Sequence, residues 1–104
     1  MTTKLAINIS EAAQDNILEL VIDHALAHFN AHEHAFRQRE VLEHSDGCGC
    51  FYCFKTFPTS EITTWVDDDK TAICPRCGMD SVIGSASGYP LTKVALRKMY
   101  ARAY

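Results

Sequence analysis

The residues best suited to chemistry are five cysteines, four of which form two pairs. Cys50 and Cys53 enclose two residues, as do Cys74 and Cys77, and twenty residues separate the pairs. Repeated C-x-x-C pairs are typical of zinc sites, because a tetrahedral ion with Zn–S bonds of about 2.3 Å takes two sulfurs from one tight turn. We therefore predict one Zn²⁺ ion bound by these four thiolates.

The predicted zinc is structural. Four protein thiolates complete the coordination sphere and leave no position for water or substrate, so the free energy of metal binding stabilises the fold. The alternative is a redox dithiol in one pair, which needs a helix N-terminus directly after the pair to lower a thiol pKa. Residues 78–80 lead into a predicted strand instead, which favours the zinc site.

The fifth cysteine, Cys48, has two interpretations. It stands two residues before Cys50, so it is an alternative ligand in the same segment. The two-residue spacing to Cys53 favours Cys50 as the ligand. Cys48 is then a partly buried free thiol beside the site.

Histidines offer a second set of metal ligands. His24, His28 and His32 recur every four residues and would share one face of a helix. Histidines at this spacing chelate zinc in metalloprotease helices, where a glutamate between them is the base. No glutamate stands between these three. A metal-dependent hydrolase is therefore the third functional hypothesis, and a solvated polar stripe is the simpler interpretation.

The end of the sequence is basic. Its last twelve residues carry four cations and no carboxylate side chain: Lys93, Arg97, Lys98 and Arg102. With tyrosines nearby as stacking groups, this segment is a candidate contact for nucleic acid or for another partner. The net charge of −3 argues against nonspecific nucleic-acid binding by the whole molecule. Packing of this helix, with its cations solvated, is the simpler interpretation.

The elements that position these groups belong to one predicted α+β domain of 104 residues. A content of 47% hydrophobic and 22% charged residues is typical of a globular domain and excludes a disordered chain. We expect residues 1–46 to form a short strand (4–9) and a helical region. Residues 47–88 would form a zinc ribbon, and residues 89–104 a C-terminal helix.

A long acidic helix is predicted before the cysteines. Apolar residues recur at helical spacing from Leu18 to Phe36, and no Gly or Pro precedes Gly47. With Ser10 as N-cap, the helix would reach His44 and be about 50 Å long. A domain of this size has a radius of gyration of only about 13 Å. The helix therefore either breaks near residues 30–33 or projects and forms a homodimer.

The segment between and after the cysteine pairs predicts short strands. Residues 57–66 and 71–73 are rich in β-forming side chains, and the polar residues 67–70 make a turn between them. Residues 81–83 supply a third strand, giving an antiparallel hairpin or three-stranded sheet. The final helix is expected to start at Tyr89-Pro90, because proline is tolerated in a first helical turn.

From Cys50 to Cys77 the chain resembles the zinc-ribbon group, which includes ribbons of transcription and ribosomal proteins and rubredoxin-like modules. Residues 71–84, TAICPRCGMDSVIG, also resemble a group of small uncharacterised bacterial cytoplasmic proteins. The resemblance implies a structural metal held by four cysteines, and a binding role. The chain departs from the usual cysteine turn by having Phe54 where glycine often stands, which puts the geometry of that turn in question.

These observations favour a non-enzymatic zinc protein that binds another protein, as a regulator, an inhibitor or an immunity-type partner. The sequence contains no Ser-His-Asp or Cys-His arrangement that spacing supports, and no phosphate-binding glycine loop. Nucleic-acid binding through the four C-terminal cations is the second hypothesis. No apolar run is long enough to span a membrane and no signal peptide is visible, so we expect a cytoplasmic protein with reduced cysteines.

Overall fold

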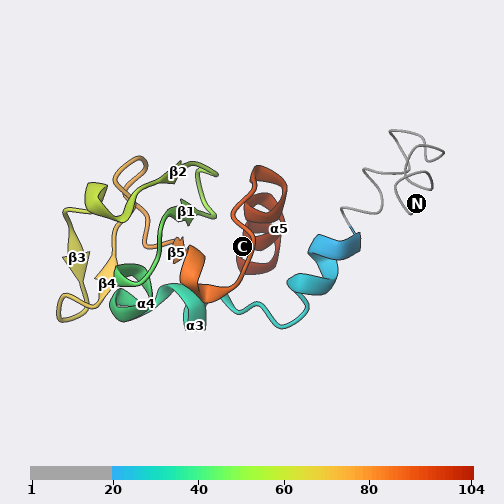
Figure 1. Ribbon diagram of the computed structural model, residues 1–104, viewed down its shortest axis with the longest axis horizontal. Coiled ribbons are helices and arrows are strands. Elements are labelled where there is room, and N and C mark those ends of the chain that lie inside the picture. The colour runs from blue at the N-terminus through green and yellow to red at the C-terminus, as the bar shows by residue number, and fades with distance from the viewer. Residues whose placement is uncertain (1–19) are drawn as a thin grey trace, which may run out of the picture.

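The computed structural model describes residues 20–104, so the predicted strand over residues 4–9 and the Ser10 helix cap lie outside the described residues. Figure 1 shows the arrangement of the elements. After a helical segment over residues 20–25 come α3 (Ala31–Ala35), α4 (Arg39–Glu43), β1 (Cys48–Cys50), β2 (Thr56–Phe57), η1 (Thr59–Glu61), β3 (Trp65–Val66), β4 (Thr71–Ala72), β5 (Val82–Gly84), η2 (Ser85–Ser87) and α5 (Lys93–Ala103). The fold class is α+β.

The prediction of one long N-terminal helix is wrong. The first helical segment ends at residue 25, and α3 and α4 are separate short helices. A new helix starts at α3 because the side chain of its N-cap, Asn30, accepts a hydrogen bond from the backbone N–H of Glu33 at 3.0 Å. α3 stops at Phe36, and Arg37 then adopts a left-handed φ of 54°, which interrupts a right-handed helix.

The strand predicted over residues 81–83 exists, but it belongs to a different sheet. β5 pairs antiparallel with β1, and β1 also pairs with β2, in a three-stranded sheet of order β2-β1-β5. Cys50 lies opposite Val82, and Cys48 lies opposite Gly84 on one side and Phe57 on the other. β1 is therefore the central strand, and its last residue is a predicted metal ligand.

The hairpin between the cysteine pairs has the predicted turn, but of the β-forming segment 57–66 only β3 belongs to it, since Phe57 lies in β2 and residues 59–61 form η1. β3 and β4 pair antiparallel, with Trp65 opposite Ala72, and residues 67–70 connect them. Three consecutive aspartates of this turn have left-handed φ values of 54°, 61° and 63°. Asp is one of the few residue types that adopt this conformation with little strain, because its short side chain can bond locally.

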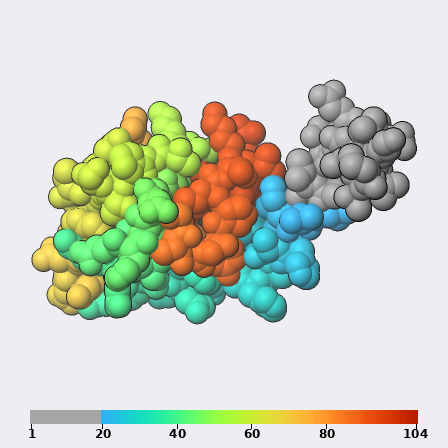
Figure 2. All heavy atoms as spheres, viewed as in Figure 1, coloured from blue at the N-terminus to red at the C-terminus, as the bar shows by residue number. Residues whose placement is uncertain are grey.

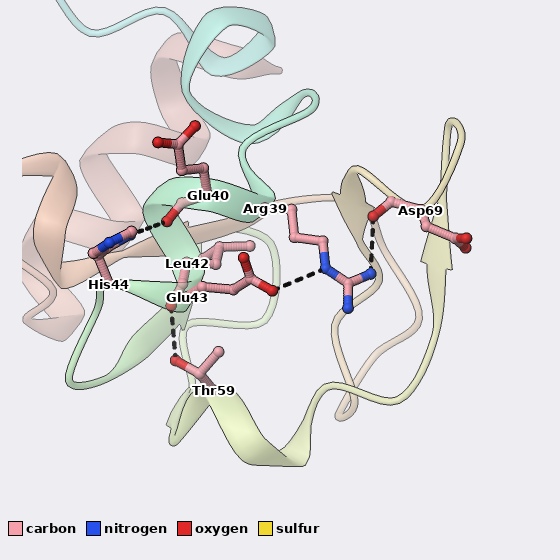
Figure 3. Close-up of polar contacts among 7 residues, drawn as sticks. All are labelled: Arg39, Glu40, Leu42, Glu43, His44, Thr59 and Asp69. Carbon is pink, nitrogen blue, oxygen red and sulfur yellow. Dashed lines mark hydrogen bonds and ion pairs between the residues drawn. The ribbon is translucent and has the colours of Figure 1, made fainter.

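Helix α4 connects this hairpin to the rest of the ribbon (Figure 3). The Arg39 side chain donates a hydrogen bond from Nη1 to the carbonyl oxygen of Asp69 at 2.9 Å, and its guanidinium lies 4.1 Å from the ring centroid of Trp65. On the other side of α4, the Thr59 hydroxyl of η1 donates to the carbonyl of Leu42 at 3.2 Å. These contacts fix the hairpin and η1 against the same short helix.

The three-stranded sheet separates two clusters of buried side chains. Consecutive residues of a strand face opposite sides, and in β5 Val82 packs into one cluster and Ile83 into the other. The first cluster surrounds the cysteines and contains Leu42, Cys48, Cys50, Phe57, Ile62, Ala72, Cys74 and Val82. The second lies under α3 and α5 and contains Leu26, Ala35, Phe51, Ile83, Ala95, Leu96 and Met99. The cysteines therefore share one face of the sheet with Leu42 of α4, and α3 and α5 pack on the other face.

The C-terminal helix α5 starts at Lys93, four residues later than predicted. Its N-cap is Thr92, whose side chain accepts a hydrogen bond from the backbone N–H of Ala95 at 3.2 Å. Figure 2 shows α5 between the ribbon and the first helical segment. None of the helices within residues 20–104 is long and apolar enough to cross a membrane.

Candidate metal centre

Four cysteine sulfurs converge where the three-stranded sheet meets the hairpin. Cys50 ends β1, Cys53 lies in the turn after it, and Cys74 and Cys77 lie between β4 and β5. Their Sγ atoms all lie within 4.8 Å of one another. The Sγ atoms of Cys50 and Cys77 are 3.7 Å apart, and those of Cys53 and Cys74 are 3.8 Å apart. The structure thus brings together the four ligands predicted from their spacing.

These distances suit a tetrahedral metal ion. A disulfide has an S–S bond of about 2.05 Å, and all five cysteines of the chain are free. Four thiolates at about 2.3 Å from a tetrahedral ion are separated from one another by about 3.8 Å. Both short sulfur–sulfur distances match this value. The cluster is therefore positioned to bind a metal ion, consistent with a zinc-ribbon-like site.

The two cysteine turns share one backbone structure. In each turn the N–H of the first cysteine donates to the carbonyl of the fifth residue after it, and the N–H of the fourth residue donates back to that cysteine's carbonyl. The N–H of the second residue donates to the cysteine Sγ at 3.4 Å. The donor–acceptor pairs are Cys50–Lys55, Phe54–Cys50 and Tyr52–Cys50 in the first turn, and Cys74–Met79, Gly78–Cys74 and Arg76–Cys74 in the second.

Phe54 occupies the position that Gly78 has in the second turn. The φ angle of Phe54 is 66° and that of Gly78 is 82°. A left-handed conformation costs a non-glycine residue about 1–2 kcal/mol. Contacts of the Phe54 ring offset this cost: its centroid lies 5.8 Å from that of Tyr100, and the Arg97 guanidinium lies 5.6 Å above it. The first turn therefore has the same backbone hydrogen bonding as the second, although it carries phenylalanine in place of glycine.

A metal ion binds cysteine as the thiolate, and the protein environment favours the thiolate at only some of the four cysteines. Burial raises the pKa of the Cys50 thiol and, to a smaller extent, that of Cys77. Burial also opposes ionisation of Cys74, but hydrogen bonds from the backbone N–H groups of Arg76 and Cys77 and from the Cys77 and Cys50 side chains together outweigh it and lower the pKa of Cys74. Four adjacent thiolates require a cation, and a divalent ion bound by all four would supply that charge.

Cys48 lies outside the four-sulfur cluster. Its Sγ atom contacts the hydroxyl oxygen of Thr59 at 3.3 Å, its side chain is fully buried, and burial raises its pKa. Cys48 and Cys50 are two residues apart in β1 and belong to the same buried cluster. Cys48 is therefore packed next to the metal site, while Cys50 faces the other sulfurs.

The three histidines predicted as a row lie in different segments. His24 belongs to the helical segment that ends at residue 25, His28 to the turn after it, and His32 to α3. The His32 ring stacks on Phe36, with their centroids 4.7 Å apart. Across residues 20–104 the four cysteines form the only group of three or more metal-binding side chains close enough to share an ion. The common helical face required by the hydrolase hypothesis is absent from this part of the chain.

The four basic residues of α5 divide into two pairs. Lys98 Nζ lies 2.9 Å from the Asp23 carboxylate, and the Arg102 guanidinium lies 3.9 Å from the same oxygen. Lys93 and Arg97 form no ion pair with any residue from 20 to 104. Within the described part of the chain, the cations of α5 without an ion pair are therefore the two nearer its start.

Sequence reasoning missed two residues of the metal centre, Tyr52 and Arg76. Each occupies the second position after the first cysteine of its turn and donates its backbone N–H to that cysteine's sulfur. Hydrogen bonds to a thiolate favour the charged form that binds metal. Their shared position in the two C-x-x-C pairs is the sequence signal that could have identified them.

No protein-family model matches the chain, and neither a curated protein nor a solved structure shows significant similarity to it. The resemblance of residues 71–84 to small bacterial proteins therefore gains no support from these comparisons. The structural features that bear on function are the four-cysteine cluster and the surface around it.

Proposed function

We propose that the chain is a small non-enzymatic zinc-binding protein whose role is to bind another protein. The observation that carries this proposal is the match between the sulfur–sulfur distances of 3.7 and 3.8 Å and the edges of a four-thiolate tetrahedron. An ion with four protein thiolates has no open position for water or substrate. Its contribution is then to the fold, and the protein acts through its surface.

The donor set supports zinc as the resident ion. Tetrahedral sites made of four sulfurs select zinc or iron. Metal analysis of the purified chain distinguishes the two, and we expect one zinc per chain. Iron instead of zinc, or a chain without metal whose thermal stability is unaffected by chelators, would contradict the proposal.

A structural role follows from where the ligands lie. Cys50 belongs to the central strand of the sheet, and Cys74 directly follows the hairpin, so the ion joins two sheets that share no strand. Zinc binding in small domains contributes about 10–16 kcal/mol, as much as the whole free energy of unfolding of a typical domain, about 5–15 kcal/mol. The ribbon is therefore expected to require its metal.

Affinity capture tests the binding role. The zinc-loaded chain is used as bait in an extract of the cells that produce it, with Cys74→Ser as a metal-deficient control. We expect one dominant protein on the zinc-loaded bait and its absence from the control. An empty capture at high bait concentration would refute a protein-binding module, whether as a regulator, an inhibitor or an immunity-type partner.

The other predicted partners receive less support. The homodimer was expected from a long projecting helix, and that helix is broken after residue 25. Nucleic-acid binding was expected from four cations, and two of them are paired with Asp23. Steep weakening of oligonucleotide binding with salt, reduced by substituting Lys93 and Arg97, would restore the nucleic-acid hypothesis.

A further inference from the structure

Three tyrosines form a contiguous exposed group beside the first cysteine turn. The ring centroids of Tyr52 and Tyr100 are 5.6 Å apart, those of Tyr52 and Tyr104 are 5.6 Å apart, and those of Tyr100 and Tyr104 are 4.9 Å apart. Each ring thus contacts the other two. The exposed fractions of Tyr52, Tyr100 and Tyr104 are 41%, 36% and 59%. We call this group, with Phe54 and Arg97 at its border, the tyrosine surface.

The tyrosine surface continues into positive charge along α5. Lys93, Arg97, Tyr100 and Tyr104 follow one another at spacings of four, three and four residues, which places them on one side of the helix. Lys93 and Arg97 are exposed and form no ion pair within residues 20–104. The cations that are neutralised, Lys98 and Arg102, instead meet Asp23.

A shallow hollow lies next to Arg97 on α5. It has a volume of about 290 Å³ and is lined by Val94, Arg97, Lys98 and Ala101. Val94, which is 41% exposed, and Ala101 make this hollow apolar, and Arg97 gives it a cationic edge, whereas Lys98 is already paired with Asp23. An apolar side chain with a carboxylate beside it would complement this arrangement.

We propose that the tyrosine surface and the adjacent cationic part of α5 bind an acidic peptide segment of a protein partner that also carries aromatic or aliphatic anchor residues. Tyrosine and arginine are enriched among the residues that dominate protein–protein binding energies. The positive charge of Lys93 and Arg97 selects carboxylates over basic segments. This assignment rests on the proposed protein-binding function and specifies its surface and the chemistry of its partner.

The packing of the tyrosines distinguishes a protein partner from a nucleic acid. Single-stranded nucleic acid stacks successive bases on separate aromatic faces along a positively charged groove. Here the three rings meet at interplanar angles of 55°, 80° and 41° and pack into one amphipathic group instead of presenting separate faces in a row. The hydroxyl of Tyr104 lies 2.8 Å from Ser81 Oγ. The chain also has a net charge of −3. These features fit a protein interface better than a phosphate backbone.

The metal centre supports this surface directly. Tyr52 lies between Cys50 and Cys53, and Phe54 follows Cys53. The turn that carries both aromatic side chains is the same one that presents two sulfurs to the ion. Binding of the acidic segment must therefore depend on the metal, even though the metal does not contact the partner.

A random peptide library displayed on phage and selected on the immobilised zinc-loaded chain tests the assignment. We expect enriched peptides that are rich in Asp and Glu and contain aromatic or aliphatic residues. The substitutions Tyr52→Ala and Arg97→Glu should each weaken binding of the selected peptides about tenfold or more, a loss typical of central interface residues. A chelator should abolish binding.

The hairpin at the other end of the ribbon supplies matched controls. Val66 is 40% exposed, like Tyr52, and Lys70 is an exposed cation, like Arg97. Val66→Ala and Lys70→Glu should change peptide binding by less than about twofold, since surface substitutions outside an interface have small effects. Each variant must retain one zinc and the thermal midpoint of the unsubstituted chain, so that lost binding is not lost folding.

Three results would overturn the assignment: a library that yields no enriched peptide, enriched peptides without acidic residues, or peptides that bind Tyr52→Ala and Arg97→Glu normally. Salt-sensitive binding of oligothymidylate that is lost in Arg97→Glu would replace it with a nucleic-acid surface. A captured protein partner whose binding is unchanged in these variants would leave the protein-binding function intact and refute only this surface. An empty capture from the cell extract would instead refute the function itself.

Discussion

Substituting Cys50 and Cys48 in turn tests whether Cys50 is a metal ligand and Cys48 only a packed thiol. Cys50 and Cys48 are both 0% exposed and stand two residues apart in β1. Only the Sγ atom of Cys50 belongs to the four-sulfur cluster, whereas that of Cys48 contacts the hydroxyl of Thr59 at 3.3 Å. Replacing each with serine makes the same chemical change at two positions of one strand, so each variant is the control for the other.

Cys50→Ser is expected to lose zinc affinity, whereas Cys48→Ser is expected to lose only a small part of the stability. A zinc binding free energy of about 10–16 kcal/mol shared by four thiolates assigns about 3–4 kcal/mol to each ligand. Cys50→Ser should therefore weaken zinc binding about 100- to 1000-fold and unfold the ribbon under conditions that the unsubstituted chain survives. Cys48→Ser keeps a hydrogen-bonding group next to Thr59 and loses only part of its apolar burial, about 1 kcal/mol. Its melting temperature should fall by about 4–8 °C, with one zinc retained.

Zinc per chain, measured after dialysis against a chelator of intermediate affinity, is the deciding assay, and thermal unfolding of the same samples gives the stabilities. Retention of zinc by Cys50→Ser would refute the assignment of this ligand. Loss of zinc from Cys48→Ser with retention by Cys50→Ser would show that Cys48 takes its place. Loss from both would mean that the strand, and not the ligand, controls metal binding.

Three further predictions concern the turns and the ionisation of the ligands. Gly78→Ala and Gly88→Ala both place a methyl group in open space at a left-handed φ, so each should lose about 1–2 kcal/mol of stability. Only Gly78→Ala should also weaken zinc binding, measured by chelator titration. Equal zinc affinities of the two variants would contradict this. Asp69→Gly should lower the urea midpoint by the equivalent of about 0.5 kcal/mol, because Asp already adopts the left-handed conformation with little strain and glycine adds freedom to the unfolded chain; a higher midpoint would show that Asp69 is strained in this turn. Zinc affinity should rise with pH, because burial raises the pKa of the Cys50 and Cys77 thiols, so the metal-free chain holds these protons at neutral pH and releases them on binding; an affinity that does not change with pH would contradict this.

Features encoded by neighbouring residues were predictable from the sequence. The two cysteine pairs met as expected from their spacing, and the polar residues 67–70 formed the turn between β3 and β4. The C-terminal helix was also predicted, although its start was not. Pro90 suggested a first helical turn, whereas the side chain of Thr92 provides the actual cap. In each of these cases the determining residues lie within one or two turns of chain.

The break in the N-terminal helix was encoded, but a stronger pattern obscured it. Asn30 followed three residues later by Glu33 is the signature of a helix start, and the structure shows the corresponding hydrogen bond. The apolar stripe that continues through this region instead suggested one helix, so a break near residues 30–33 was only one of two alternatives. That stripe does not face one surface, because the chain turns between Leu26, which is fully buried, and α3.

The pairing of β5 with β1 could not be predicted from local sequence. Both strands are three residues long, too short for an alternating pattern to identify a partner or a register. The nearer strands of the hairpin were the natural expectation, since sequential strands usually neighbour one another. β5 pairs with β1 because the cysteine turn that ends β1 meets the cysteine turn that follows the hairpin at the four-sulfur cluster.

The identical hydrogen bonding of the two cysteine turns has a consequence for the order of folding. Each turn closes within six residues, whereas Cys50 and its partner Val82 in the sheet are more than thirty residues apart. Closing a longer loop costs more chain entropy, so the turns are expected to form before the sheet. An ion captured by one turn and then by the other places Cys77 next to β1, and β5 begins only five residues later. The metal would then act first as a guide for strand pairing during folding, and only afterwards as a component of the finished core.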